Sequence, residues 1–339
     1  MNVLLKGYFD RNFGDDIMHC MIAEKLDGHR IFVNCPQREK VMHLEKYDNV
    51  FINEGCDNID VCLYVIGTGF MYRGKRAKAE KLISMLFAKK SKKIKSAVIN
   101  CSIEAFDGKL EKLLAKHDIK PYSMITTRDE NSYKFFCENF KDKQIEFCPD
   151  MVFSAEVFKN AEKPQGERLG VALVNRLYSN ENYDYFKKMA LMCDEYIEKH
   201  GCPVSLFAFD SGLENDTEAV ISVKNMMKHP EMVKDVIYNG DINIFANEIS
   251  KCTVFVTSRF HGAVAAAACG IDVVCVSDRE KLVRLSSDMG IHCENKSGLT
   301  EKSALSLVEK ARKAKIDGYS EKAEGHITAA VEFVNSVRK

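Results

Sequence analysis

Short apolar runs alternate with helical patterns along the first half of the chain. The apolar runs, rich in β-branched residues, lie at residues 2–5, 30–34, 61–66, 96–100 and 124–127. Amphipathic helical spacing separates several of them, as at residues 15–26 and in a basic stretch at residues 75–90. Strands that alternate with helices form right-handed crossovers, so this pattern predicts a parallel sheet.

A second alternation begins after a polar stretch. Residues 162–167 include Pro164 and Gly166 and are typical of a linker. Beyond them, apolar runs at residues 169–174, 203–208, 254–257 and 272–276 again alternate with helical patterns, as at residues 183–200 and 216–228. A chain of 339 residues exceeds the usual size of one core.

The pattern therefore predicts an α/β protein with two Rossmann-like parallel-sheet domains that face a cleft, similar to the GT-B arrangement. The N-terminal domain is predicted at residues 1–162 and the C-terminal domain at residues 168–318. A last helix, at residues 321–338, is predicted to pack back on the first domain.

The end of the strand at residues 254–257 carries the most informative polar side chains. Arg259 and His261 follow it directly, and Gly262 leads into an alanine-rich helix. Open α/β sheets bind ligands at such strand ends, where side chains and helix N–H groups converge. An arginine beside a histidine indicates an anion held near a proton donor, or else structural salt bridges at a basic strand end.

Two further cations come from neighbouring strand ends in the same predicted domain. Arg176 ends the run at residues 169–174, and Lys281 lies beyond the run at residues 272–276. Together with Arg259 and His261 they would suit a small, dense anion such as a phosphorylated carboxylate.

A polar loop follows the first strand and precedes a helix. It contains Asn12, Gly14, Asp15 and Asp16. Glycine permits a tight turn, and one aspartate can cap the helix. Two successive carboxylates exceed what a cap requires, so the second could bind or deprotonate a sugar hydroxyl.

Two other strand ends carry candidate residues. Thr68 lies between Gly67 and Gly69, but this loop has neither the GxGxxG pattern nor a Walker lysine. Arg128 follows the run at residues 124–127 and could either reach the cleft or pair with Asp129.

The charge balance and the cysteines narrow the class of protein. Lysine plus arginine (49) equals aspartate plus glutamate (49), so no overall field attracts nucleic acid. The 13 cysteines form no CxxC pair and lie mostly in apolar runs, which indicates buried free thiols in a reducing compartment.

No secretory signal or membrane-spanning run is evident, so a cytoplasmic protein is expected. The basic stretch at residues 75–95 is either a solvated face or a peripheral contact with the inner face of a membrane.

The ordered set of these motifs resembles the polysaccharide pyruvyl transferase family. The resemblance runs from residue 7 to about residue 290 and rests on residues 12–16, 127–129 with Ser132, 148–150, Arg176, Asp216, 258–261 and Lys281. It differs from the family pattern in Asp16, where glutamate is expected, in Phe260, where leucine is usual, and in the absence of a tyrosine before Lys281. These differences bear mainly on the acceptor sugar.

The resemblance implies a function and a set of roles. Members have a GT-B-like fold and transfer the pyruvyl group of phosphoenolpyruvate to a sugar of a cell-surface polysaccharide as a ketal. Phosphoenolpyruvate is then the co-substrate, and no metal or other cofactor is expected. Arg259 would bind the donor and His261 would act as the acid, with Arg176, Lys281 and Arg128 as further donor ligands. Asn12, Gly14 and Thr68 would bind a free or lipid-linked sugar acceptor, and Asp15 or Asp16 would be the base.

Two alternatives stay open at this point. A nucleotide-sugar glycosyltransferase of the GT-B type would use the same cations to hold a diphosphate. A catalytically silent binding protein of the same fold would keep Arg259 and His261 buried and paired with carboxylates. The sequence does not define the oligomeric state.

Overall fold

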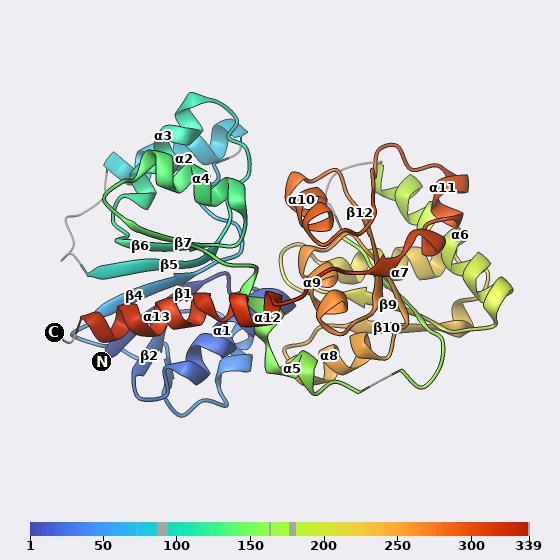
Figure 1. Ribbon diagram of the computed structural model, residues 1–339, viewed down its shortest axis with the longest axis horizontal. Coiled ribbons are helices and arrows are strands. Elements are labelled where there is room, and N and C mark those ends of the chain that lie inside the picture. The colour runs from blue at the N-terminus through green and yellow to red at the C-terminus, as the bar shows by residue number, and fades with distance from the viewer. Residues whose placement is uncertain (73, 87–93, 163, 176–180, 338–339) are drawn as a thin grey trace. The chain divides into compact units, whose positions relative to one another are not determined.

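The computed structural model describes residues 1–72, 74–86, 94–162, 164–175 and 181–337. These residues form two compact units (Figure 1). Unit 1 comprises Met1–Tyr8, Met18–Met151 and Glu321–Lys339, and unit 2 comprises Phe9–Ile17 and Val152–Ser320. Each unit is an α/β domain built on its own sheet.

The sheet of unit 1 is parallel throughout. Its order is β3-β2-β1-β4-β5-β6-β7, which is the doubly wound order of Rossmann folds. Neighbours pair in parallel register, as Val3 with Val61 and Ile31 with Val50. The strands are β1 (Asn2–Gly7), β2 (Arg30–Val33), β3 (Val50–Ile52), β4 (Val61–Val65), β5 (Lys95–Cys101), β6 (Met124–Thr127) and β7 (Gln144–Phe147).

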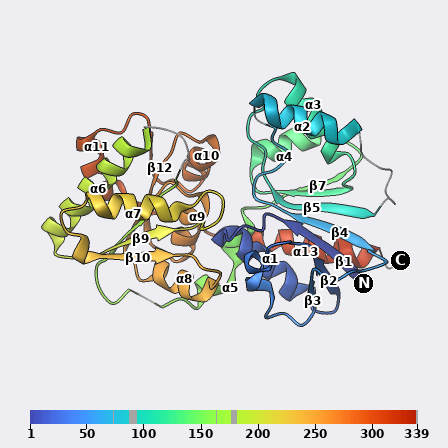
Figure 2. The same ribbon diagram turned by 180° about the vertical axis from the view of Figure 1, so that it is seen from behind.

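Helices cover both faces of this sheet (Figures 1 and 2). One face carries α2 (Gly74–Leu86), α3 (Lys109–Ile119) and α4 (Glu130–Asn139), and the other carries α1 (Phe13–Lys25) and α13 (Gly325–Ser336). The terminal helix α13 packs on β5 and β6 and buries Ile327, Phe333 and Val334. A short helix, α12 (Tyr319–Ala323), precedes it.

The sheet of unit 2 repeats the same winding. Its order is β10-β9-β8-β11-β12-β13, with β14 (Arg312–Lys313) antiparallel to β12. The parallel strands are β8 (Leu169–Ala172), β9 (Val204–Ala208), β10 (Val233–Ile237), β11 (Val254–Thr257), β12 (Asp272–Val276) and β13 (Cys293–Glu294). The strand order reverses between β8 and β11, so this pair is the topological switch point where ligands of such sheets bind.

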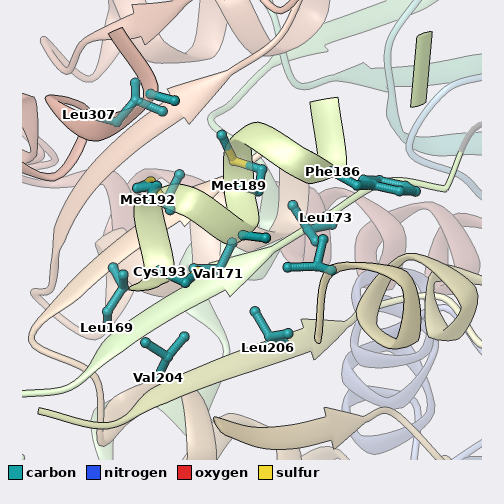
Figure 3. Close-up of a cluster of buried hydrophobic side chains, with 14 of the residues drawn as sticks. Leu169, Val171, Leu173, Phe186, Met189, Met192, Cys193, Val204, Leu206 and Leu307 are labelled. Carbon is teal, nitrogen blue, oxygen red and sulfur yellow. The ribbon is translucent and has the colours of Figure 1, made fainter. Parts of the chain in front are cut away.

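Two helical layers also flank the sheet of unit 2. One contains α6 (Glu181–His200), α7 (Asp216–Met226) and α11 (Glu301–Leu305), and the other α8 (Ile242–Ser250), α9 (Phe260–Ala268) and α10 (Glu280–Asp288). Figure 3 shows Leu169, Val171 and Leu206 of the sheet packed against Met189 and Cys193 of α6. The short helix α5 (Glu156–Lys159) packs on α8 and α9. Single-turn 3-10 segments lie at Arg38–Lys40, Met42–Leu44, Met151–Ser154, Pro230–Met232 and Val308–Lys310.

The structure confirms two parallel-sheet domains, and it divides the chain differently from the linker pattern. Unit 2 begins at Val152, because the segment before the expected linker packs through α5 on helices of unit 2. The segment Phe9–Ile17, expected in the N-terminal domain, also belongs to unit 2. Residues 87–90, predicted as the end of a basic helix, lie outside the described residues. Among the described helices, none has the length and apolar character needed to cross a bilayer.

Candidate functional site

The N-terminal loop is anchored in unit 2 by a buried aromatic residue and by backbone bonds to the end of β9. The Phe13 ring is fully buried, with ring centroids 5.5 Å from Phe209, 5.4 Å from Tyr238 and 4.7 Å from Phe245. Phe13 N donates to Phe209 O at 3.0 Å, and Ser211 N donates to Arg11 O at 3.2 Å. Residues 12–16 therefore lie at the carboxyl ends of the unit 2 strands.

Asn12 caps α1, a role that the sequence suggested for an aspartate. Its Oδ1 accepts from Gly14 N at 3.2 Å and from Asp15 N at 3.4 Å, while its Nδ2 donates to Asp210 Oδ2 at 3.2 Å. Because Asn12 satisfies the helix N-terminus, the carboxylates of Asp15 and Asp16 are not needed there.

The two aspartates of the first turn are both buried. Asp16 is fully buried and accepts a hydrogen bond from Tyr238 Oη at 2.8 Å, whereas Asp15 is 9 % exposed. Burial raises the pKa of Asp16 well above its ordinary value, although the Tyr238 bond opposes this shift. Asp15 is the more accessible of the two candidate bases.

His261 lies directly against the N-terminal loop. A Cβ atom on Gly14 would come within 1.9 Å of His261 Nδ1, so the imidazole occupies the space that any side chain at position 14 would need. His261 is partly exposed and stands in the first turn of α9, which begins at Phe260. The helix thus starts two residues earlier than Gly262. Glycine is required at 262 because a Cβ there would lie 2.4 Å from Thr257 Oγ1.

Arg259 is held by two carboxylates that the sequence reasoning did not assign to it. Its Nε donates to Asp216 Oδ2 at 2.7 Å, its Nη2 donates to Asp216 Oδ1, and its Nη1 donates to Glu214 Oε2. Burial alone would lower the pKa of Arg259, but Asp216 and Glu214 outweigh burial and raise it. These bonds use three of the five guanidinium N–H groups.

Asp216 joins three strand ends of unit 2. Besides binding Arg259 after β11, it accepts from the backbone N–H groups of Asn175 after β8 and Asp210 after β9, both at 3.1 Å. The N-cap of α7 is Asn215, and Asp216 is the first residue of the helix. Burial raises the pKa of Asp216 against the opposing effect of Arg259. Asp216 therefore fixes the guanidinium at the switch point.

Glu214 interacts electrostatically with Arg279 and Lys281 as well as with Arg259. Burial tends to raise its pKa, but Arg259, Arg279 and Lys281 lower it by their charges, and the net shift is downward. The Glu214 side chain is 36 % exposed, whereas that of Asp216 is fully buried. The sequence signal that could have identified these partners of Arg259 is the pair of acidic residues, Glu214 and Asp216, that follows β9. Arg176, predicted as a further cation here, lies outside the described residues.

Arg128 and Thr68 lie in unit 1, at the ends of β6 and β4. Arg128 Nη1 forms a buried ion pair with Asp150 Oδ2 at 2.8 Å, and its Nη2 donates to Thr68 Oγ1 at 3.2 Å. Asp129, one of the two partners considered for Arg128, caps α4 and accepts from Ser132 N at 2.8 Å. Two motifs of the sequence, at residues 127–129 and 148–150, thus pair with each other.

A buried histidine extends this network to the terminal helix. His326 of α13 lies with Nδ1 2.6 Å from Thr126 Oγ1 and Nε2 3.0 Å from Pro149 O. Thr126 Oγ1 also accepts from Asn100 N at 2.9 Å, and Asn100 Nδ2 donates to Asp150 Oδ2 at 3.1 Å. Burial lowers the pKa of His326 to about 4. Its neutral ring therefore accepts at Nδ1 and donates at Nε2.

The described residues of the site thus fall into two groups. Asn12, Gly14, Asp15, Asp16, Arg259, His261 and Lys281 belong to unit 2, and Thr68 and Arg128 belong to unit 1. In unit 2 a partly exposed imidazole, two carboxylates and a group of cations share the carboxyl edge of a doubly wound sheet. This arrangement can bind an anion beside a proton donor.

The solved structures that resemble this chain define the class of fold. The UDP-GlcNAc 2-epimerase from Neisseria meningitidis bound to UDP-GlcNAc has a TM-score of 0.63 at 12 % identity, over 99 % of this chain and 100 % of that chain. The UDP-GlcNAc 2-epimerase from Methanocaldococcus jannaschii gives 0.60 at 12 % identity, over 98 % and 100 %. A calicheamicin glycosyltransferase gives 0.52 at 13 % identity, over 99 % and 98 %. The protein has a GT-B-like fold of two Rossmann-like domains.

The family follows from the sequence match. A family model described as polysaccharide pyruvyl transferase covers residues 7–279, and the chain belongs to that family. The match includes Arg259 and His261 and ends two residues before Lys281. No curated protein matches the chain. Membership of this family supports the general activity of a polysaccharide pyruvyl transferase, and the protein is therefore a transferase.

Proposed function

We propose that the protein transfers the pyruvyl group of phosphoenolpyruvate to a sugar as a ketal and releases phosphate. The observation that carries this proposal is the contact between His261 and Gly14. It joins the predicted acid to the loop with Asp15 and Asp16, beside the cations at the end of β11. Family membership supports the same chemistry.

The reaction needs an acid, an anion site and a base. His261 would protonate the methylene carbon of phosphoenolpyruvate, which leaves an oxocarbenium-like centre at C2. One sugar hydroxyl attacks C2 and passes its proton to Asp15 or Asp16. The bond from C2 to the phosphate oxygen then breaks, and phosphate departs with the proton that the aspartate holds. A second hydroxyl closes the ketal and returns its proton to His261. The cations stabilise the negative charge on the departing phosphate, and the scheme uses no metal or other cofactor.

The salt bridges of Arg259 bear on the silent-protein alternative. That alternative expects Arg259 to be paired with carboxylates, as it is, and His261 to be buried, whereas His261 is partly exposed. We assign different roles to the two carboxylates. Asp216 orients the guanidinium, and the more exposed Glu214 occupies the position that the donor carboxylate takes when phosphoenolpyruvate binds. An anion that displaces Glu214 would keep the cations neutralised.

We infer that the acceptor is a sugar of a cell-surface polysaccharide or its precursor, free or lipid-linked, and family membership supports this inference. Asn12 and Gly14 would contact it, and Arg176 would add to donor binding. Thr68 and Arg128, which the resemblance also assigns to acceptor and donor binding, belong to unit 1. A cytoplasmic location agrees with a donor that is a soluble phosphorylated metabolite.

Ligand-dependent unfolding and phosphate release test the proposal together. Phosphoenolpyruvate at about 100 times its Kd should stabilise the protein by about 2.7 kcal/mol, and sugar acceptors should make phosphate release from it continuous. UDP-sugars are the comparison, because structures of this fold bind UDP-GlcNAc. Stabilisation by a UDP-sugar and not by phosphoenolpyruvate would support the glycosyltransferase alternative. If phosphoenolpyruvate binds but no acceptor makes the protein release phosphate from it, the result would support a catalytically silent protein.

A further inference from the structure

The outer face of α3 exposes large apolar side chains among lysines. Leu110 is 42 % exposed and Leu113 is 64 % exposed. Residues three apart lie on the same face of a helix, so the two leucines form one apolar strip. Lys109 and Lys112 are exposed beside them, while Leu114, Ala115 and Ile119 face the core.

The neighbouring helix α2 has the same character. Leu82 is 41 % exposed and Ile83 is 54 % exposed, and Lys75 near the start of the helix is also exposed. Lys78 Nζ lies 2.9 Å from Asp107 Oδ2, and Lys81 pairs with Asp118, which fixes α2 against α3. Figures 1 and 2 show the two helices side by side on one face of unit 1.

Positive charge is concentrated on these two helices. They carry seven lysine and arginine residues against three aspartate and glutamate residues, whereas the whole chain has a net charge of zero. All three acidic residues are engaged, since Glu111 is buried, Asp118 binds Lys81 and Glu80 binds Arg76. The apolar side chains therefore stand in a locally cationic surface.

We propose that this α2–α3 surface, formed by Leu82, Ile83, Leu110, Leu113, Lys75, Lys109 and Lys112, binds the headgroup region of an anionic lipid bilayer. Exposed leucine and isoleucine can enter the boundary of the acyl chains, and lysines extend their stems to reach anionic headgroups. A second copy of the chain fits this surface less well, because pairing of two such surfaces would oppose like charges. The inference does not depend on the proposed reaction.

Vesicle flotation of the full chain tests the proposal. Phosphatidylcholine vesicles that contain phosphatidylglycerol should bind the protein, and vesicles of phosphatidylcholine alone should bind it less. Replacing both Lys109 and Lys112 with glutamate should weaken binding by at least about fivefold per lost cation, the equivalent of about 1 kcal/mol each. Leu110→Ser with Leu113→Ser should also weaken it, because the apolar contact is lost.

A matched variant in unit 2 separates this effect from general changes of the surface. Ile221 and Ile244 are 51 % and 62 % exposed on α7 and α8, and changing both to serine should leave vesicle binding unchanged. Circular dichroism and thermal unfolding check that each variant folds, since exposed substitutions change stability little. Equal binding to both kinds of vesicle, no binding at all, or equal loss in the unit 2 variant would overturn the proposal. So would a change from dimer to monomer in the leucine variants with no effect on lipid binding.

Discussion

At the scale of single residues, the site depends on how the positive charge of Arg259 is paired with carboxylates. Arg259 has two carboxylate partners with different exposure, and Asp216 is bound to the backbone of two strand ends as well. A buried carboxylate in such a network orients the guanidinium, whereas a partly exposed one can be exchanged for a ligand. This difference gives Glu214 and Asp216 separate expected phenotypes.

Glu214→Gln should improve donor binding. The change removes the negative charge that competes with phosphoenolpyruvate for Arg259 and Lys281, so the KM for phosphoenolpyruvate should fall roughly two- to tenfold. Steady-state assays of phosphate release measure this KM. Glu301→Gln on α11 is the control, because it removes one exposed charge elsewhere in unit 2. A raised KM would show instead that Glu214 helps to assemble the anion site.

His261→Ala should reduce kcat by about 10²- to 10⁴-fold, because it removes the proton donor to the methylene carbon. Thermal stability should change little by comparison. His292→Ala, at a more exposed histidine of unit 2, is the matched control and should keep its activity. Near-normal turnover of His261→Ala would remove this residue from the acid role.

At the scale of elements, the start of α1 and the start of α9 determine each other's position. The His261 ring packs where a side chain at position 14 would lie, so the glycine is required by a close approach and not by its backbone angle. Phe13 anchors the same turn in an aromatic cluster. The first turns of two helices thus bring the candidate acid and the candidate base together.

Gly14→Ala should therefore impair both folding and activity. The added methyl group forces the imidazole to move, which should lower the free energy of unfolding by about 1–3 kcal/mol and reduce kcat more than it raises KM. Gly28→Ala is the control, because a Cβ there meets no atom within 4 Å. Unchanged kcat in Gly14→Ala would show that His261 can shift without loss.

His326 of the terminal helix α13 should make a pH-dependent contribution to the free energy of unfolding. Burial lowers the pKa of this imidazole from 6.5 to about 4, so the unfolded chain takes up a proton first as the pH falls. The contribution is complete above pH 6.5 and is lost as the pH falls toward 4. The difference in unfolding free energy between the wild type and His326→Gln should therefore shrink by about 2 kcal/mol between pH 7.5 and pH 5.

Urea unfolding at the two pH values measures this difference. His292→Gln, at an exposed histidine, is the comparison for a substitution outside the buried network. If the difference in unfolding free energy between the wild type and His326→Gln does not vary with pH, the His326 ring is not held neutral in the folded protein.

At the scale of the whole molecule, each unit has its own apolar core, and all 13 cysteines are free thiols. Seven are buried, namely Cys20, Cys35, Cys62, Cys101, Cys193, Cys252 and Cys275. Burial raises the pKa of Cys101 and Cys275 to about 12, so little reactive thiolate forms near neutral pH. The thiols act as small apolar side chains in both cores.

Thiol titration should therefore separate two classes. The seven buried cysteines should react with a thiol reagent only after unfolding in denaturant, and omission of a reductant should not change the free energy of unfolding. Rapid reaction of all 13 thiols in the native protein would contradict the burial of these side chains.

The sequence by itself determined the two parallel sheets, because strand and helix periodicities are local properties of the chain. It also located Arg259, His261 and Lys281, since residues that follow buried strands must lie at one edge of a sheet. It missed edge strands such as β3 and β7, whose burial is partial and whose apolar pattern is short.

Only the tertiary structure decided which unit holds residues 12–16 and which carboxylates hold Arg259. Phe13 finds its partners about 200 residues further along the chain, and no periodicity in a polar loop encodes such a contact. Asp210, Glu214 and Asp216 were visible as acidic residues, but their choice of partner depends on three strand ends meeting in space. Long-range packing and charge pairing, and not local pattern, therefore assembled the site.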